Sequence, residues 1–211
     1  MNEQIENHIG ALVNILTQMP EAEKISALNG IRLKLHDVSP FKNEPVDCVL
    51  WVPGDTVRAN DYNPNAVAPP EMKLLETSIT VDGFTQPIVV VKEKMDDREY
   101  TVVDGFHRNR VGKESSKVKS RVNGYLPIAI DGDENTPMSE RMASTIRHNR
   151  ARGSHNIDLM SNIVAELVEM GKSDGWIAKH LGMDVDELLR LKQITGLAAL
   201  FKDREYSRSW M

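Results

Sequence analysis

The chain has 211 residues, of which 40% are hydrophobic and 27% charged, and its formal net charge is −5. This composition is typical of a globular protein and excludes collagenous and intrinsically disordered chains. A single cysteine, Cys48, excludes an intrachain disulfide framework and favours a reducing compartment. No stretch is apolar for long enough to cross a bilayer, and the N-terminus lacks the pattern of a signal peptide. We therefore expect a cytoplasmic protein that does not act in a membrane.

Residues 1–40 are predicted to form a helical arm. Ile5, Ile9, Leu12 and Leu16 recur at helical spacing, and Pro20 interrupts the pattern before it resumes. Such an amphipathic arm either packs against its own domain or mediates self-association or partner docking. A homodimer is therefore one of the partners that we consider.

Residues 46–132 alternate between strand-like and helix-like segments. The predicted strands lie in VDCVLWVP, QPIVVV, REYTVV and GYLPIAI, and helices are predicted after Pro70 and after Gly105. This alternation indicates an α/β unit, so the whole chain belongs to the α+β class.

Residues 136–200 are predicted to be helical, and residues 201–211 form a polar tail. Thr136 and Pro137 are typical of a helix start, and Ala178, Gly182 and Leu188 have the spacing of a helix-turn-helix. The second helix of that unit begins with DVDE, and carboxylates repel the phosphates of DNA. DNA contacts are therefore expected from arginines elsewhere in the region, namely Arg141, Arg147 and Arg152.

Three potential cations follow Gly105 at the start of a predicted helix. His107, Arg108 and Arg110 stand where the helix dipole is already positive, an unfavourable place for cations without a counter-charge. An anion held by the backbone N–H groups and these side chains would explain the pattern. The alternative is a solvated basic surface.

Three motifs together resemble the ParB/sulfiredoxin superfamily. They are VDGFTQPIVVV at 81–91, VVDGFHRNRV at 102–111 and TIRHNRARGSHNIDL at 145–159, in the family's order. The GFHR sequence is more similar to sulfiredoxin and to the IbrB-like co-activator proteins than to ParB partition proteins. Phe106 occupies the place of the sulfiredoxin nucleophile, a cysteine, so the chain is not expected to be a sulfiredoxin.

The resemblance implies a nucleotide site at the helix that follows Gly105. Its nucleotide would be ATP, ADP or CTP with Mg²⁺, and Asp104 and Asn149 are the candidates for holding the metal. The resemblance assigns nucleotide contacts to Gly83, Gln86, Pro87, Asp104, Gly105, Phe106, His107, Arg108, Asn149 and Arg150.

The resulting functional hypothesis is an IbrB-like nucleotide-binding regulator that acts as a switch in gene regulation or DNA transactions. The resemblance also implies a phosphoadenosine-phosphosulfate-reductase-like partner protein. One alternative is a small-molecule phosphotransferase of the free-serine-kinase type, for which Asp61, Asp104 and His107 are the catalytic candidates. A ParB-like nuclease is the other.

Overall fold

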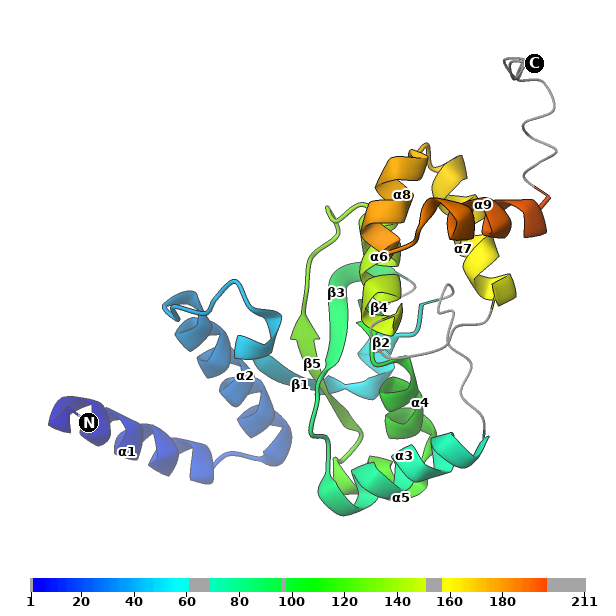
Figure 1. Ribbon diagram of the computed structural model, residues 1–211. Coiled ribbons are helices and arrows are strands. Elements are labelled where there is room, and N and C mark those ends of the chain that lie inside the picture. The colour runs from blue at the N-terminus through cyan, green and yellow to red at the C-terminus, as the bar shows by residue number, and fades with distance from the viewer. Residues whose placement is uncertain (1, 61–68, 96–97, 151–156, 197–211) are drawn as a thin grey trace, which may run out of the picture.

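The computed structural model describes residues 2–60, 69–95, 98–150 and 157–196. In these ranges a mixed sheet occupies the centre, with an arm of two helices on one side and a group of helices on the other (Figure 1). The predicted α+β class, helical C-terminal region and N-terminal helical arm are therefore confirmed.

The sheet has five strands in the order β1-β5-β3-β4-β2. β1 pairs antiparallel with β5, β5 parallel with β3, β3 antiparallel with β4, and β4 parallel with β2. The bounds are β1 Val49–Pro53, β2 Val57–Arg58, β3 Ile88–Met95, β4 Arg98–Asp104 and β5 Tyr125–Ile130. Branched side chains of the three inner strands, such as Ile88, Val102 and Ile128, are fully buried, which accounts for the continuous apolar runs in the sequence.

Three helices form a second apolar cluster beside the sheet. They are α3 Pro69–Asp82, α4 Phe106–Glu114 and α5 Ser116–Arg121, and they bury Ile79, Val111 and Val118. At Gly112 the helix α4 approaches the sheet so closely that an added Cβ would lie 2.4 Å from Leu126 Cδ2. Glycine at this position therefore sets the distance between α4 and β5.

The sequence did not predict α5 as a separate helix. Ser115 is extended, with φ −76° and ψ 115°, so it ends α4 and caps α5, where its side chain accepts a hydrogen bond from the Val118 N–H. β1 ends at Pro53, as predicted, and a one-turn 3₁₀ helix at Gly54–Thr56 separates it from β2, a two-residue strand that the sequence did not predict.

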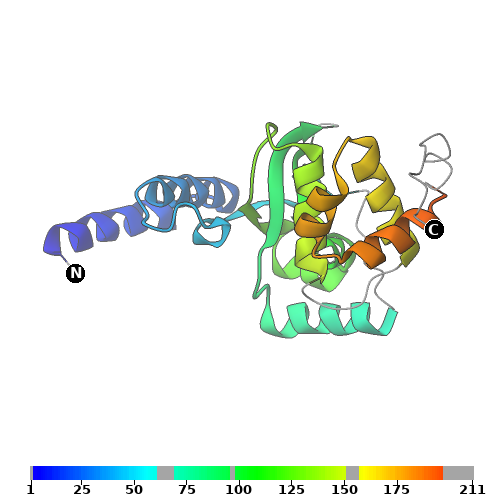
Figure 2. The same ribbon diagram turned by 45° about the horizontal axis from the view of Figure 1, so that its top comes forward.

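The C-terminal helices have a hydrophobic cluster of their own, which includes Met142, Ile146, Leu167 and Ile177. The helices are α6 Met138–Arg150, α7 Ile157–Glu169, α8 Asp174–Leu181 and α9 Val185–Ile194 (Figure 2). Gly182 ends α8 in the left-handed conformation at φ +65°, and Asp184 caps α9 by accepting a hydrogen bond from the Glu187 N–H. α8 and α9 thus form the predicted helix-turn-helix.

α6 connects this helical region to the sheet. It packs on β4, and the buried Asn60 side chain lies between them, 2.9 Å from the Val102 carbonyl of β4 and 3.5 Å from Thr145 Oγ1 of α6. The division between a domain at 46–132 and another at 136–200 remains a prediction.

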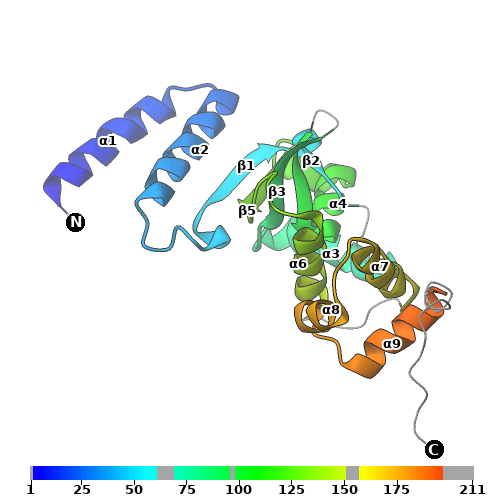
Figure 3. The ribbon, with the colours of Figure 1, turned by 90° about the horizontal axis from the view of Figure 1, so that it is seen from above.

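The arm consists of α1 Glu3–Thr17 and α2 Glu21–Asp37, and neither helix has a buried residue. α2 lies beside the edge strand β1, and α1 extends away from the rest of the molecule (Figure 3). Within the described ranges, no helix is long and apolar enough to span a membrane.

Candidate functional site

A cleft of about 330 Å³ lies where the ends of three strands meet α4 and α6. Gln86 and Pro87 precede β3, and Asp104 ends its antiparallel neighbour β4, so these residues lie at the same end of the sheet. Asp131 follows β5 and lies near them because β5 pairs only with the first residues of β3, Ile88–Val90. The complete lining is Pro45, Val46, Gln86, Pro87, Val89, Asp104, Arg108, Ala129, Asp131 and His148. The structure thus brings together four of the predicted site residues: Gln86, Pro87, Asp104 and Arg108.

Arg108 is the central cation of the cleft. Its Nη1 donates to Gln86 Oε1 at 2.5 Å, and its Nη2 lies 3.2 Å from Asp104 Oδ2. The side chains of Arg108 and Asp104 are only 15% and 5% exposed. Because both partners hold the guanidinium before any ligand arrives, binding an anion here costs little side-chain entropy.

Gly105 makes this position of Arg108 possible. Its φ is +89°, which L side chains rarely adopt, and an added Cβ would lie 2.9 Å from Arg108 Nη2. The guanidinium therefore lies directly over Gly105 at the N-terminus of α4. The backbone N–H groups of this first turn have no intrahelical hydrogen-bond acceptor.

His107 and Arg110 lie outside the cleft lining. His107 is half-buried, and burial, aided by the charge of Arg110, holds the pKa of its imidazole below the ordinary value. His107 is therefore neutral at pH 7, and its ring packs edge-to-face against Phe106. Arg110 pairs with Glu114 on the exposed side of α4, with 2.9 Å between Nε and Oε2. Of the three potential cations after Gly105, only Arg108 faces the cleft.

The sequence did not single out Asp131 as a site residue, whereas His148 belongs to the third motif, TIRHNRARGSHNIDL. Asp131 follows a buried strand, a position that is typical of site residues, but its place beside Val90 depends on the β3–β5 pairing. His148 comes from α6 and reaches the cleft from the helical region. Asp104, Asp131 and His148 all line the cleft, but together they are not placed as a metal-binding group.

Other predicted residues are elsewhere or not described. Gly83 lies at the end of α3 with φ +82°, next to the Arg121 side chain and outside the cleft lining. The side chains of Asn149 and Arg150, and all of Asp61 and Arg152, lie outside the described residues. The described residues contain no group of three or more histidines, cysteines or carboxylates placed to hold a metal ion.

The arginines predicted to contact DNA have different environments. Arg141 is 93% buried by the fold itself, with its Nη1 2.5 Å from Glu93 Oε2 and its Nε donating to the Thr136 carbonyl. That position speaks against a DNA contact, because the guanidinium ties α6 to β3. Arg147 is exposed on α6, where its Nη1 lies 3.4 Å from His180 Nδ1 of α8.

The exposed residues at the start of α9 are acidic and apolar. Val185 and Leu189 are exposed, and so are Asp184 and Asp186 at the start of the helix. The N-terminal turn of a second helix is where major-groove contacts are usually made, and carboxylates there oppose phosphate binding.

Cys48, the only thiol of the chain, is buried in the sheet core. Burial raises the pKa of this thiol, so the nucleophilic thiolate is disfavoured. Its environment is that of a structural cysteine.

Comparison with known protein families identifies two regions of the chain. The ParB N-terminal domain family matches residues 41–125, and the IbrB-like C-terminal HTH domain family matches residues 155–203. The chain combines a ParB-like N-terminal domain with an IbrB-like helix-turn-helix domain. The ParB match spans β1–β4 and α3–α5 and ends at Tyr125, the first residue of β5, and the IbrB-like match spans α7–α9.

One relative is similar to this chain over almost its entire length. The Escherichia coli (strain K12) protein YbdM, which is described as uncharacterized, is 56% identical over 200 residues, or 94% of this chain and 93% of YbdM. The match is long enough to include most of the arm.

Solved structures with a related fold include truncated ParB from Caulobacter crescentus. One is complexed with CTP-gamma-S, with 17% identity over 74% of this chain and 87% of that chain and a TM-score of 0.38. Another is complexed with the centromeric parS site, with 17% identity over 72% and 76% of the chains and a TM-score of 0.45.

Proposed function

We propose that this ParB-like protein is a regulator that binds a nucleoside di- or triphosphate in the cleft beside Arg108. The observation that carries the proposal is the arrangement of Arg108 itself. A guanidinium that is only 15% exposed is held by Gln86 and Asp104 at the N-terminus of α4. Arginine forks and helix N-termini both bind phosphate oxygens.

The remaining walls of the cleft suit a nucleotide better than a free phosphate. Pro45, Val46, Val89 and Ala129 supply apolar surface, against which a nucleobase or ribose can pack. The Gln86-Pro87 turn adds an amide group near the same surface, able to donate and accept hydrogen bonds.

The acidic groups of the cleft favour a divalent cation beside the phosphates. Asp104 partly neutralises Arg108, and Asp131 adds a second negative charge. A polyphosphate alone would be repelled by these carboxylates, whereas Mg²⁺ would be bound by their oxygens and by the phosphates together. The chain's own residues would hold the metal through Asp131 and Asp104, with Asn149 as a further predicted ligand.

The switch hypothesis rests on α6. This helix contributes His148 to the cleft and Met142 and Ile146 to the core of the helical region. A ligand that contacts both His148 and Arg108 would therefore stabilise one arrangement of α6 against the ParB-like domain. Such a bias is what a nucleotide-dependent regulator of gene expression or DNA transactions requires.

A DNA contact of this regulator would not be centred on the start of α9. The exposed Arg147 of α6 and, by prediction, Arg152 are better suited to phosphates than Asp184 and Asp186. A partner of the phosphoadenosine-phosphosulfate-reductase-like class remains a prediction from the IbrB-like relationship.

The test is calorimetric titration of the wild type with ATP, ADP and CTP, each with and without Mg²⁺. The matched variants are Arg108→Ala and Arg110→Ala. Both remove an arginine side chain from α4, but only Arg108 lines the cleft. We expect a preference for one base, dependence on Mg²⁺, and loss of binding in Arg108→Ala alone. If no nucleotide binds the wild type, or if both variants bind equally well, the proposal is wrong.

The same samples distinguish a regulator from a phosphotransferase. A kinase of the free-serine type would consume nucleotide only when an acceptor is added, whereas a regulator would hydrolyse it slowly or only bind it.

A further inference from the structure

A second cavity, of about 420 Å³, lies at the end of the sheet where β1 ends and β5 begins. It is enclosed by the 3₁₀ turn Gly54–Thr56, the C-terminal half of α4, and the connection between α5 and β5. Sites for small molecules have volumes in this range. The cavity shares no lining residue with the cleft beside Arg108, and α5 lies well below α6 in Figure 1. It is therefore a candidate for a separate site.

Backbone hydrogen bonds fix the walls of this cavity. The Gly54 N–H donates to the Gly124 carbonyl at 2.9 Å, and the Gly124 N–H donates to the Lys119 carbonyl at 2.9 Å. Gly124 has a φ of +78°, which allows the tight turn between α5 and β5. Because these contacts form within the chain itself, the cavity exists before a ligand arrives, and binding needs little reorganisation.

Lys113 of α4 contributes an ammonium group whose hydrogen-bonding capacity is only partly used. The side chain is partly buried, its Nζ donates to the Val57 carbonyl, and it has no other hydrogen bond or ion pair with the part of the chain that the structure describes. An ammonium group has three N–H donors. Burial, together with the charge of Arg98, lowers the pKa of the Lys113 amine, and the weaker effect of Asp55 opposes this shift. An anion in the cavity would accept from the unused donors and stabilise the charged form.

Lys119 supplies a second cation from α5. Its side chain is exposed and passes close to the Gly124 backbone, because a Cβ added to Gly124 would lie 3.9 Å from Lys119 Cε. The cavity lining thus has two lysines and one carboxylate, that of Asp55, which leaves an excess of one positive charge. The whole chain has a formal net charge of −5, so this local excess is opposite in sign to the overall charge. A concave surface with excess positive charge attracts small anions.

We propose that this cavity binds a small organic anion whose carboxylate or phosphate group contacts Lys113 and Lys119. The ammonium groups of lysine bind either kind of anion as point charges. Pro53 and the Tyr125 ring supply surface against which the carbon skeleton of the ligand packs. The proposal does not rest on nucleotide binding, since the residues that hold this anion lie outside the cleft beside Arg108.

Amide NMR spectroscopy of the isotope-labelled full-length chain tests the proposal. The probes are benzoate and phenyl phosphate, with benzamide as a control that has nearly the shape of benzoate but no charge. We expect at least one anion to shift the amide signals of Gly54, Gly112 and Gly124 and to bind at least about tenfold more tightly than benzamide. The tighter of the two anions then identifies the preferred anionic group. Shifts confined to residues of the cleft beside Arg108, equally tight binding of benzamide, or no shift with either anion would overturn the proposal.

Three variants assign the binding to the two lysines. Lys119→Met removes a charge from an exposed side chain, so the fold should be retained while the affinity for the anion falls by at least about threefold. Lys113→Met should lower the affinity by at least about tenfold, because it removes a charged donor from inside the cavity. Lys117→Met is the control, since it makes the same change in α5 outside the lining and should leave the affinity unchanged. If Lys113→Met fails to fold, Lys119→Met decides, and equal affinities of the Lys119 and Lys117 variants would refute the site.

Discussion

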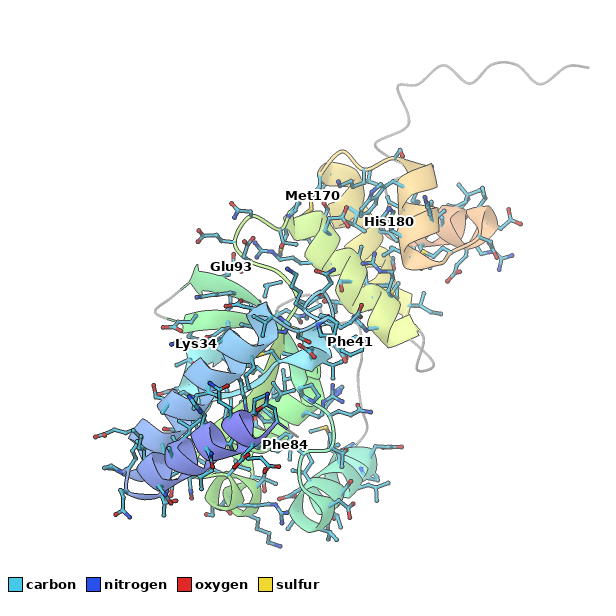
Figure 4. The ribbon with its side chains drawn as sticks, turned by 90° about the vertical axis from the view of Figure 1, so that its left-hand side faces the viewer. Lys34, Phe41, Phe84, Glu93, Met170 and His180 are labelled. Atoms are coloured by element: carbon cyan, nitrogen blue, oxygen red, sulfur yellow. The ribbon has the colours of Figure 1, made fainter. Side chains whose placement is uncertain are left out.

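Arg141 of α6 and Glu93 of β3 form an ion pair across the boundary between the helical region and the sheet, with 2.5 Å between Nη1 and Oε2. The two side chains are 8% and 24% exposed, and the guanidinium also donates to the carbonyls of Thr136 and Glu134. Glu93 lies near the end of the sheet that faces the C-terminal helices (Figure 4). This pair therefore fixes α6, and with it the position of His148 at the cleft.

Arg141→Ala is expected to lower the free energy of unfolding by about 3 kcal/mol, because it leaves the Glu93 carboxylate and two carbonyls without their donor. Urea unfolding measures the change. Arg110→Ala is the control, since it removes an exposed ion pair and should cost no more than about 0.5 kcal/mol. Equal losses in the two variants would contradict the structural role of Arg141.

The same pair makes stability depend on pH. The hydrogen bond from Arg141 holds the pKa of the Glu93 carboxyl below its ordinary value, against the opposing effect of burial. A depressed folded-state pKa contributes stability above the unfolded value of about 4.3, and this contribution is lost as the pH falls through the folded-state pKa. Urea unfolding gives the free energy of unfolding of the wild type and of Glu93→Gln at a series of pH values from neutral to acidic. The free energies of the two proteins should converge below about pH 4. If the free energies of unfolding of the two proteins differ by the same amount at every pH, the pKa of Glu93 is not lowered in the folded state.

Local signals in the sequence predicted most of the fold. Pro70, Gly105, Thr136-Pro137 and Gly182 mark helix ends through backbone geometry that acts over a few residues, and the structure has helix ends at these places. The split at Ser115 was not predicted, because a serine can either continue a helix or cap one, and packing decides between the two.

The cleft was only partly predictable for a different reason. Gln86, Asp104, Arg108 and His148 belong to the three motifs, whereas Pro45 and Asp131 are brought to the cleft by the tertiary fold. Arg141 was interpreted as a surface cation because its partner Glu93 lies 48 residues away in the sequence. Long-range pairing of this kind leaves no trace in local charge patterns.

Gly105→Ala is expected to reduce both stability and nucleotide affinity. The positive φ alone costs about 1–2 kcal/mol, and the new Cβ would displace the Arg108 guanidinium from Gln86 and Asp104. Gly171→Ala is the control, because its φ is +76° but nothing lies within 4 Å of the added Cβ. Both variants should lose stability in urea unfolding, Gly105→Ala the more because it also breaks the contacts of Arg108, and only Gly105→Ala should lose affinity, by at least about tenfold. If Gly105→Ala binds nucleotide as tightly as Gly171→Ala, the position of Arg108 does not determine binding.

Asn29 of α2 connects the arm to the sheet, because its side chain makes the two hydrogen bonds that a neighbouring strand would make. Its Nδ2 donates to the Trp51 carbonyl at 2.6 Å, and its Oδ1 accepts from the Trp51 N–H at 3.1 Å. Trp51 lies in the edge strand β1, where these backbone groups face away from β5. The side chain of Asn29 therefore occupies a position that would otherwise be open to another strand.

Asn29→Leu keeps the size of the side chain but removes both hydrogen bonds. It is expected to cost about 1–3 kcal/mol, because the Trp51 carbonyl and N–H lose their partner in a half-buried place. Hydrogen exchange should then show faster exchange of the Trp51 amide while the amides of the central strand β3 remain protected. Asn7→Leu, an exposed substitution in α1, is the control and should leave the Trp51 amide unchanged. Slow exchange at Trp51 in Asn29→Leu would show that other contacts of α2 hold the arm against β1.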